Sequence, residues 1–99
     1  MFLGRVIGTV WSTKKDEQLV GAKFLIVQEL DLNLKQKERI LVAVDSVGAG
    51  DGEVVLVASG SSSRMTTFTK DKPVDAVIMA IVDKLDVTTK ELLKEKMGL

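Results

Sequence analysis

The hydrophobic residues of this chain gather in five segments that are separated by polar stretches. The segments are rich in Val, Ile and Leu, a composition that favours extended structure. Gly21 gives a turn signal directly before the second segment. We therefore predict five β-strands, which cover residues 3–11, 22–30, 40–44, 54–58 and 77–82.

The polar stretches between these segments predict loops and short helical pieces. Residues 12–18 and 61–72 are mostly small, polar or charged, which indicates loops. The stretch Asp31–Arg39 is charged and poor in β-branched residues, so it predicts a loop or one helical turn. Thr88 followed by Glu91 has the spacing of a capping box, which predicts a short C-terminal helix. One side of that helix would carry Leu92, Leu93 and Met97.

The last three predicted strands are nearly continuous apolar runs. A strand with one solvated face alternates apolar and polar residues, so both faces of these strands need cover. A five-stranded sheet curled into a barrel hides one face in its interior. The connections are too short for several crossover helices, and 99 residues leave little other material to cover the second face. We therefore expect a mainly β barrel whose outer face is covered by sister subunits in a head-to-tail cyclic homo-oligomer.

Composition removes several classes of chemistry. Fourteen basic and fourteen acidic residues cancel, so no net charge attracts nucleic acid or an anionic membrane. The chain has no cysteine, histidine or tyrosine, and so lacks a thiolate, the commonest general base near neutral pH and a phenolic acid. The remaining polar residues form no coherent catalytic set. We therefore expect no enzyme activity and no cofactor.

The sequence also lacks the features of a membrane-spanning or exported protein. No segment approaches the roughly 20 uninterrupted apolar residues that span a bilayer. The N-terminus has no basic region followed by a long apolar core. The absence of cysteine suits a reducing compartment. These features predict a soluble cytoplasmic protein.

The stretch Asp45–Arg64 combines a glycine loop, an apolar strand and a serine-rich turn. Glycine is tolerated where the backbone takes positive φ or where another group approaches closely, and this loop has Gly48, Gly50 and Gly52. A bound phosphate, a tight turn inside the monomer or a neighbouring copy would each explain them. The loop does not match G-x-G-x-x-G and precedes a strand, whereas a phosphate site needs a helix N-terminus. A tight turn or a contact between subunits is therefore favoured.

Three other polar groups each allow a structural and a functional interpretation. Ser61–Arg64 could hold an anion at the start of a helical turn, but a capping serine and an ion-paired arginine explain it more simply. Lys14 and Lys15 belong to an ordinary solvated loop or contact another protein at the rim of an oligomer. Acidic residues at strand ends form turns or ion pairs more often than a metal site, so we expect no metal. These acids are Asp45, Asp51, Glu53, Asp75, Asp83 and Asp86.

Several separated motifs together resemble the EutN/CcmL family, the vertex proteins of bacterial microcompartments. The resemblance covers about residues 1–86, the predicted shell domain, and leaves 87–99 as a variable tail. Ser63 departs from it, because the family often has alanine there. The motifs, in their expected order, are Gly4-x-Val6, Thr9-Val10-Trp11-x-Thr13-x-Lys15, Leu19-x-Gly21-x-Lys23-Phe24-Leu25-x-Val27-Gln28, Val42-Ala43-Val44-Asp45-Ser46-Val47-Gly48-Ala49-Gly50-x-Gly52-Glu53-x-Val55-Leu56, Ser59-Gly60-Ser61-Ser62-x-Arg64, Val74-Asp75-Ala76-x-Ile78 and Ile81-Val82-Asp83.

The resemblance implies a small OB-like β-barrel with a short helical turn. It also implies assembly into a ring, most simply a pentamer, at the vertices of a cytoplasmic polyhedral shell that encloses metabolic enzymes. The partners would be further copies of the chain and the hexameric shell proteins that form the facets, with no nucleic acid and no membrane. The alternative is an OB-fold nucleic-acid-binding protein, which the scarcity of aromatic residues and the balanced charge disfavour.

Under this interpretation, the glycine loop and the serine-rich turn are expected at the subunit interface or the axial pore. Glu53 would offer a charge-assisted hydrogen bond to a neighbouring copy. Lys14 and Lys15 are expected to contact neighbouring shell proteins. The candidates for the interface or pore are Asp45, Ser46, Gly48, Ala49, Gly50, Gly52, Glu53, Ser61, Ser62 and Arg64.

Overall fold

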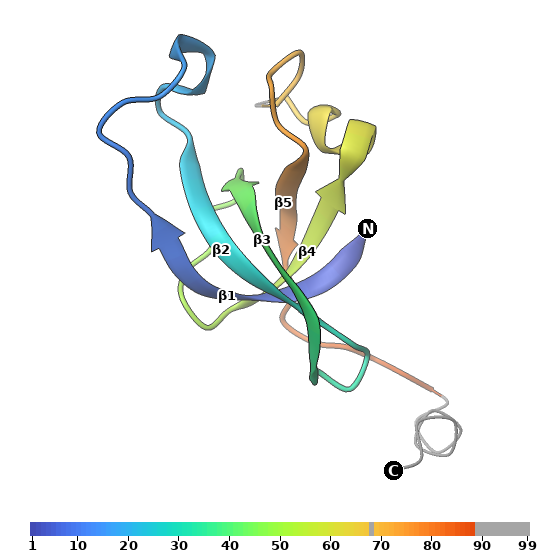
Figure 1. Cartoon of the computed structure of the whole chain (residues 1–99). Helices are drawn as coiled ribbons and strands as arrows, with labels where there is room; N and C mark the ends of the chain where they lie inside the picture. The colour runs from blue at the N-terminus through green and yellow to red at the C-terminus, as the bar shows by residue number, and fades with distance from the viewer. Residues whose placement is uncertain (68, 89–99) are drawn as a thin grey trace.

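The computed structural model describes residues 1–67 and 69–88, and five strands in it close into a barrel (Figure 1). Neighbouring strands follow the order β1-β2-β3-β5-β4, and all pairs are antiparallel except β3 and β5. Two short 3₁₀ helices are the only helices among the described residues. The elements are β1 (Phe2–Val10), η1 (Glu17–Leu19), β2 (Lys23–Leu30), β3 (Gln36–Asp45), β4 (Val54–Ser59), η2 (Gly60–Arg64) and β5 (Ala76–Ile81).

All five predicted strands are confirmed, and so is the mainly β class. The turn expected at Gly21 is also present, since this residue has a φ of 87°. The residues of the predicted C-terminal helix from 89 onward lie outside the described residues. The described residues therefore confirm the predicted barrel, which β1 to β5 form without the C-terminal segment.

The barrel interior and a second cluster outside it together account for the continuous apolar run at the start of β5. Consecutive residues of one strand serve different clusters: Ile78 belongs to the interior and Val77 to the second cluster. This arrangement buries both faces of β5 near its start within a single chain. The interior contains Val6, Leu25, Val27, Ala43, Ala49, Val55, Val57, Ala76 and Ile78. The second cluster contains Ala22, Val44, Ala58, Val74 and Val77.

The prediction of a loop or helical turn over residues 31–39 was wrong in its second half. A turn occupies residues 32–34, and β3 begins at Gln36 and pairs with the end of β2. Residues 36–40 of β3 are exposed, so no apolar alternation marks them as a strand. The polar sequence therefore reflects an exposed hairpin extension.

Two polar side chains of β2 hold this extension in place. The Gln28 amide nitrogen donates to the carbonyl oxygens of Lys37 at 2.6 Å and Arg39 at 3.2 Å. The Glu29 carboxylate lies 3.1 Å from Lys37 Nζ and 3.0 Å from Arg39 Nε. Because Gln28 and Glu29 are both buried, their hydrogen bonds form in a setting where an unpaired polar group would cost about 1–3 kcal/mol.

Candidate functional site

The glycine loop between β3 and β4 is organised at its start by the Asp45 side chain. Asp45 Oδ1 accepts hydrogen bonds from the backbone N–H groups of Val47 at 3.1 Å, Gly48 at 3.1 Å and Ala49 at 3.2 Å. Ser46 Oγ donates to the carbonyl oxygen of Ile78 at 2.7 Å, which ties the loop to β5. Asp45 and Ser46 thus shape the loop from within the chain.

The end of the loop is fastened to β1. The Gly52 N–H donates to the Val6 carbonyl at 2.8 Å, and the Val6 N–H donates to the Glu53 carbonyl at 3.0 Å. The Arg5 guanidinium donates to the Gly52 carbonyl at 2.8 Å. Glu53 Oε1 accepts from the Gly50 N–H at 2.6 Å, so this oxygen already has a partner in its own chain.

Backbone conformation accounts for two of the three loop glycines. Gly48 has a φ of 78° and Gly52 a φ of 82°, and no atom of the described chain lies within 4 Å of a Cβ built at either. A Cβ at Gly50 would lie 3.4 Å from Glu53 Oε1, which is ordinary contact. Within one chain, the tight turn therefore explains Gly48 and Gly52 through their positive φ.

We expect Gly48→Ala to lower the free energy of unfolding by about 1–2 kcal/mol, because alanine resists this left-handed conformation. Gly48→Asn is expected to cost clearly less, since asparagine adopts the same region more readily. Urea unfolding at one fixed protein concentration measures both. Equal losses in the two variants would contradict the conformational explanation and would point to crowding at this position.

The serine-rich turn η2 is fixed by its one buried serine. Ser63 Oγ is within hydrogen-bond distance of the carbonyl oxygens of Gly60 at 2.6 Å and Val74 at 3.0 Å. Arg64 Nη1 lies 3.5 Å from the same Val74 carbonyl. Ser59 occupies the N-cap position without a side-chain hydrogen bond, so no serine side chain caps the helix. Ser61 and Ser62 remain exposed.

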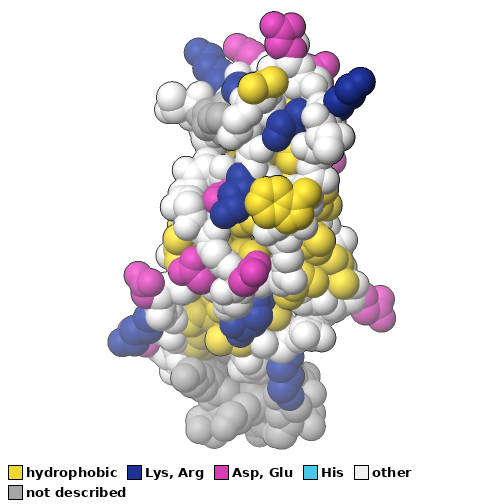
Figure 2. Space-filling view, turned by 90° about the vertical axis from the view of Figure 1, so that its left-hand side faces the viewer, with side chains coloured by type: hydrophobic (Ala, Val, Ile, Leu, Met, Phe, Trp, Pro, Cys, Tyr) yellow, Lys and Arg dark blue, Asp and Glu magenta, His cyan; other side chains and the backbone are white. Residues whose placement is uncertain are grey.

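The loop between β1 and β2 carries the two candidate lysines. Lys15 Nζ donates to the Ala22 carbonyl at 2.9 Å and lies 5.2 Å from the centre of the Phe24 ring. Lys14 is exposed beside it. Trp11, which the sequence pattern placed in the first strand, lies just beyond β1 and is 88% exposed. In Figure 2, hydrophobic side chains reach the surface over the middle of the face on the β1 side.

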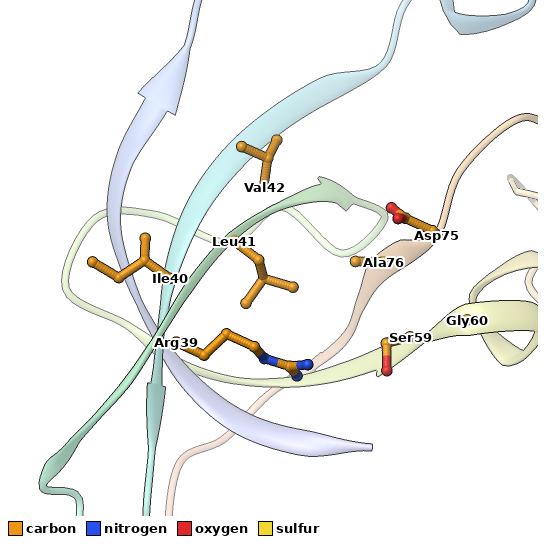
Figure 3. Close-up of a pocket in the computed structure, with 8 residues that line it drawn as sticks. All are labelled: Arg39, Ile40, Leu41, Val42, Ser59, Gly60, Asp75 and Ala76. Atoms are coloured by element: carbon orange, nitrogen blue, oxygen red, sulfur yellow. The ribbon is translucent and has the colours of Figure 1, made fainter.

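A groove of about 590 Å³ opens between β3 and the adjoining ends of β4 and β5 (Figure 3). Leu41 and Arg39 point from β3 toward the other wall of the groove, whereas Ile40 points away from it. Ile40 and Val42 are 55% and 48% exposed. The groove is lined by Arg39, Ile40, Leu41, Val42, Ser59, Gly60, Asp75 and Ala76.

Sequence reasoning missed this groove because a strand pattern does not show where a barrel pairs incompletely. The available signal was the continuous apolar run over residues 40–44, because alternate residues of a strand face outward and the interior needs only the others to be apolar. The structure thus gives three separate surface elements: the glycine loop, the β1–β2 loop and the groove. The serine-rich turn adjoins the groove through Gly60.

Two other features, a cluster of metal-binding side chains and a membrane-spanning helix, are absent from the described part of the chain. Residues 1–67 and 69–88 contain no group of three or more acidic, histidine or cysteine residues placed to hold a metal ion. None of the helices formed by these residues has the length and apolarity needed to cross a membrane.

Comparison with known proteins identifies the family. The family described as "Ethanolamine utilisation protein EutN/carboxysome" matches residues 1–83. The shell vertex protein GrpN of Rhodospirillum rubrum is 46% identical over 86 residues, which are 87% of this chain and 97% of GrpN. The carboxysome shell vertex protein CcmL of Synechocystis is 44% identical over 96 residues, with 97% and 96% of the two chains covered.

The fold agrees with this relationship. The solved structure described as the GrpN pentameric microcompartment shell protein superposes with a TM-score of 0.81 at 44% identity, covering 89% of this chain and all of that chain. The family match over residues 1–83 includes all five strands of the barrel. The chain belongs to the EutN/CcmL family of bacterial microcompartment shell vertex proteins.

Proposed function

We propose that five copies of this chain form a ring that occupies the vertices of a polyhedral microcompartment shell in the cytoplasm. The observation that carries the proposal is the match to the whole of GrpN, a relative described as pentameric. The protein acts as a structural component, and its chemistry consists of contacts between subunits. A flat layer of hexagonal tiles cannot close without fivefold positions, so a pentamer supplies the geometry that closure needs.

The barrel suits this role as an OB-like module with loops at its ends. Its strand order and the parallel pairing of β3 with β5 support the OB-like assignment. A closed ring needs two different contact surfaces on each subunit, because each copy contacts one neighbour with each of them. Exposed apolar residues lie on separate parts of the subunit and could form these two contact surfaces; they include Trp11, Ile40 and Val42.

Within this ring, the glycine loop and the exposed side of the serine-rich turn are assigned to the subunit interface or the axial opening. The loop is compact and internally hydrogen-bonded, so it can approach another copy without losing its shape. Lys14 and Lys15 are assigned to contacts with hexameric shell proteins, since Lys15 is anchored and both lysines are exposed in one loop. Trp11 extends that exposed surface.

Residues 87–99 are assigned to a tail that the ring does not need. The family match covers residues 1–83 and so ends before this segment, which supports the assignment. We expect native mass spectrometry to find five subunits both in the full chain and in a variant truncated after residue 86. The shared stoichiometry follows if the barrel contains all ring contacts.

Two results would separate the parts of this proposal. A full chain that stays monomeric at micromolar concentration would refute the proposed ring. A pentameric full chain with a monomeric but folded truncated variant would preserve the ring and contradict the assignment of the tail. Circular dichroism of the truncated variant establishes whether the barrel is intact.

A further inference from the structure

The barrel has an incompletely paired junction between β3 and β5. Residues of β3 from Gln36 to Asp45 pair with β2 along one edge. Along the other edge, Val44 pairs with Val77 and Asp45 with Ile78, and these are the only pairs with β5 in the described chain. The edge of β3 before Val44 therefore has no strand beside it.

An open strand edge presents unpaired backbone N–H and C=O groups, and proteins usually protect such edges with charge, proline or a covering segment. The edge from Ile40 to Val42 has none of these devices. It lies beside the groove, whose opposite wall contains the Asp75 and Ser59 side chains. Gly60 N–H donates to the Asp75 carbonyl at 2.8 Å, which fixes that wall.

The charge at the end of this edge is already neutralised. Arg39 Nε lies 3.0 Å from Glu29 Oε1, and the Arg39 guanidinium carbon lies 4.3 Å from the centre of the Phe2 ring. These contacts fix the guanidinium in the groove wall. Because its charge is paired with Glu29, Arg39 opposes the pairing of another strand with this edge less than an unpaired arginine would.

The side chains beside the edge suit a strand on both of its faces. Leu41 points toward the groove, and Ile40 points to the outer surface. A segment paired along this edge would place alternate side chains against Leu41 and Ala76 on one side and near Ile40 and Val42 on the other. Such a segment would satisfy the backbone groups and cover exposed apolar surface together.

We propose that an extended segment of a neighbouring copy of this chain lies in the groove and pairs with the open edge of β3 between Arg39 and Ala43. This inference rests on the proposed pentamer, whose closed ring requires every subunit to receive a different surface of the next copy. The groove is the receiving surface. It combines an open edge, exposed apolar side chains and polar walls in one place.

The first test compares Val42→Lys with Leu32→Lys, because the two native side chains are 48% and 49% exposed. Val42 borders the groove, whereas Leu32 lies in the β2–β3 turn. We expect Val42→Lys to raise the concentration at which rings dissociate by at least about tenfold, the effect of losing one well-packed interface residue. Leu32→Lys is expected to retain the wild-type ring. Light scattering after size-exclusion chromatography measures both.

The second test is hydrogen exchange of the backbone amides of residues 39–43. The assembled wild-type protein should exchange the amides on this edge at least about tenfold more slowly than the folded, dissociated Val42→Lys variant. Wild-type rings with equally fast exchange would overturn the proposed pairing, as would an unchanged ring in Val42→Lys. In both cases the pentamer would stand. A wild-type chain that forms no ring would overturn the proposed function and this inference together.

Discussion

Replacing Gly4 with alanine is expected to lower the free energy of unfolding by about 1–3 kcal/mol, the usual cost of overpacking a core. Gly4 is buried in β1, where it faces β2. A Cβ at this position would fall well inside contact distance of Val27 Cγ1 and 3.1 Å from the Gln28 carbonyl oxygen. Val27 is completely buried, so its side chain has little room to move. Urea unfolding at one protein concentration measures the loss.

Gly8→Ala in the same strand is the matched control. Its nearest neighbour would be Ile26 Cδ1 at 3.3 Å, the end of a flexible and partly exposed side chain. We expect a loss well below that of Gly4→Ala. If the two variants lost the same stability, the close approach of β1 and β2 at Gly4 would not be the reason for glycine there.

Ile78→Ala is expected to cost about 2–5 kcal/mol, the range for truncating a large buried aliphatic side chain. Ile78 is completely buried and lies where β5 joins both of its neighbours, paired with Asp45 of β3 and Val57 of β4. Its carbonyl also accepts the hydrogen bond from Ser46 Oγ. The cavity would therefore form at the junction that closes the barrel and anchors the glycine loop.

Ile40→Ala provides the comparison for the same change of side chain at an exposed position, since Ile40 is 55% exposed on β3. We expect it to cost less than about 1 kcal/mol in the dissociated protein, because little buried area is lost. Urea unfolding of both variants at a concentration below ring assembly isolates this difference. Similar losses for Ile78→Ala and Ile40→Ala would contradict the placement of Ile78 in the core.

The strand prediction succeeded where local composition and core packing agree. The runs at residues 54–58 and 77–82 became β4 and β5 because Val55, Val57 and Ile78 fill the barrel interior. It failed at residues 36–39, where partners distant along the chain decide the conformation. The buried Gln28 and Glu29 of β2 hold that segment through hydrogen bonds and ion pairs. The local sequence of residues 36–39 does not reveal such bonds to another strand.

The glycine loop illustrates a prediction that the structure refined. Its sequence indicated a tight turn or a close contact and left both explanations open. The positive φ values of Gly48 and Gly52 come from the turn itself, and Asp45 and Glu53 satisfy backbone N–H groups inside it. Its place in the ring remains a prediction, because intrachain geometry accounts for the turn without naming a neighbour.

The sequence by itself determined the five apolar strand segments, the lack of common catalytic side chains and the family, because each depends on residue types and their order. Only the tertiary structure decided that the apolar runs divide between two clusters, and that β3 keeps an open edge before Val44. Barrel closure depends on which distant strands meet and over what length. The runs in β3 and β5 look alike in sequence, yet Ile40 and Val42 on the outer face of β3 stay on the surface, whereas the second cluster covers Val77 and Ile78 fills the interior.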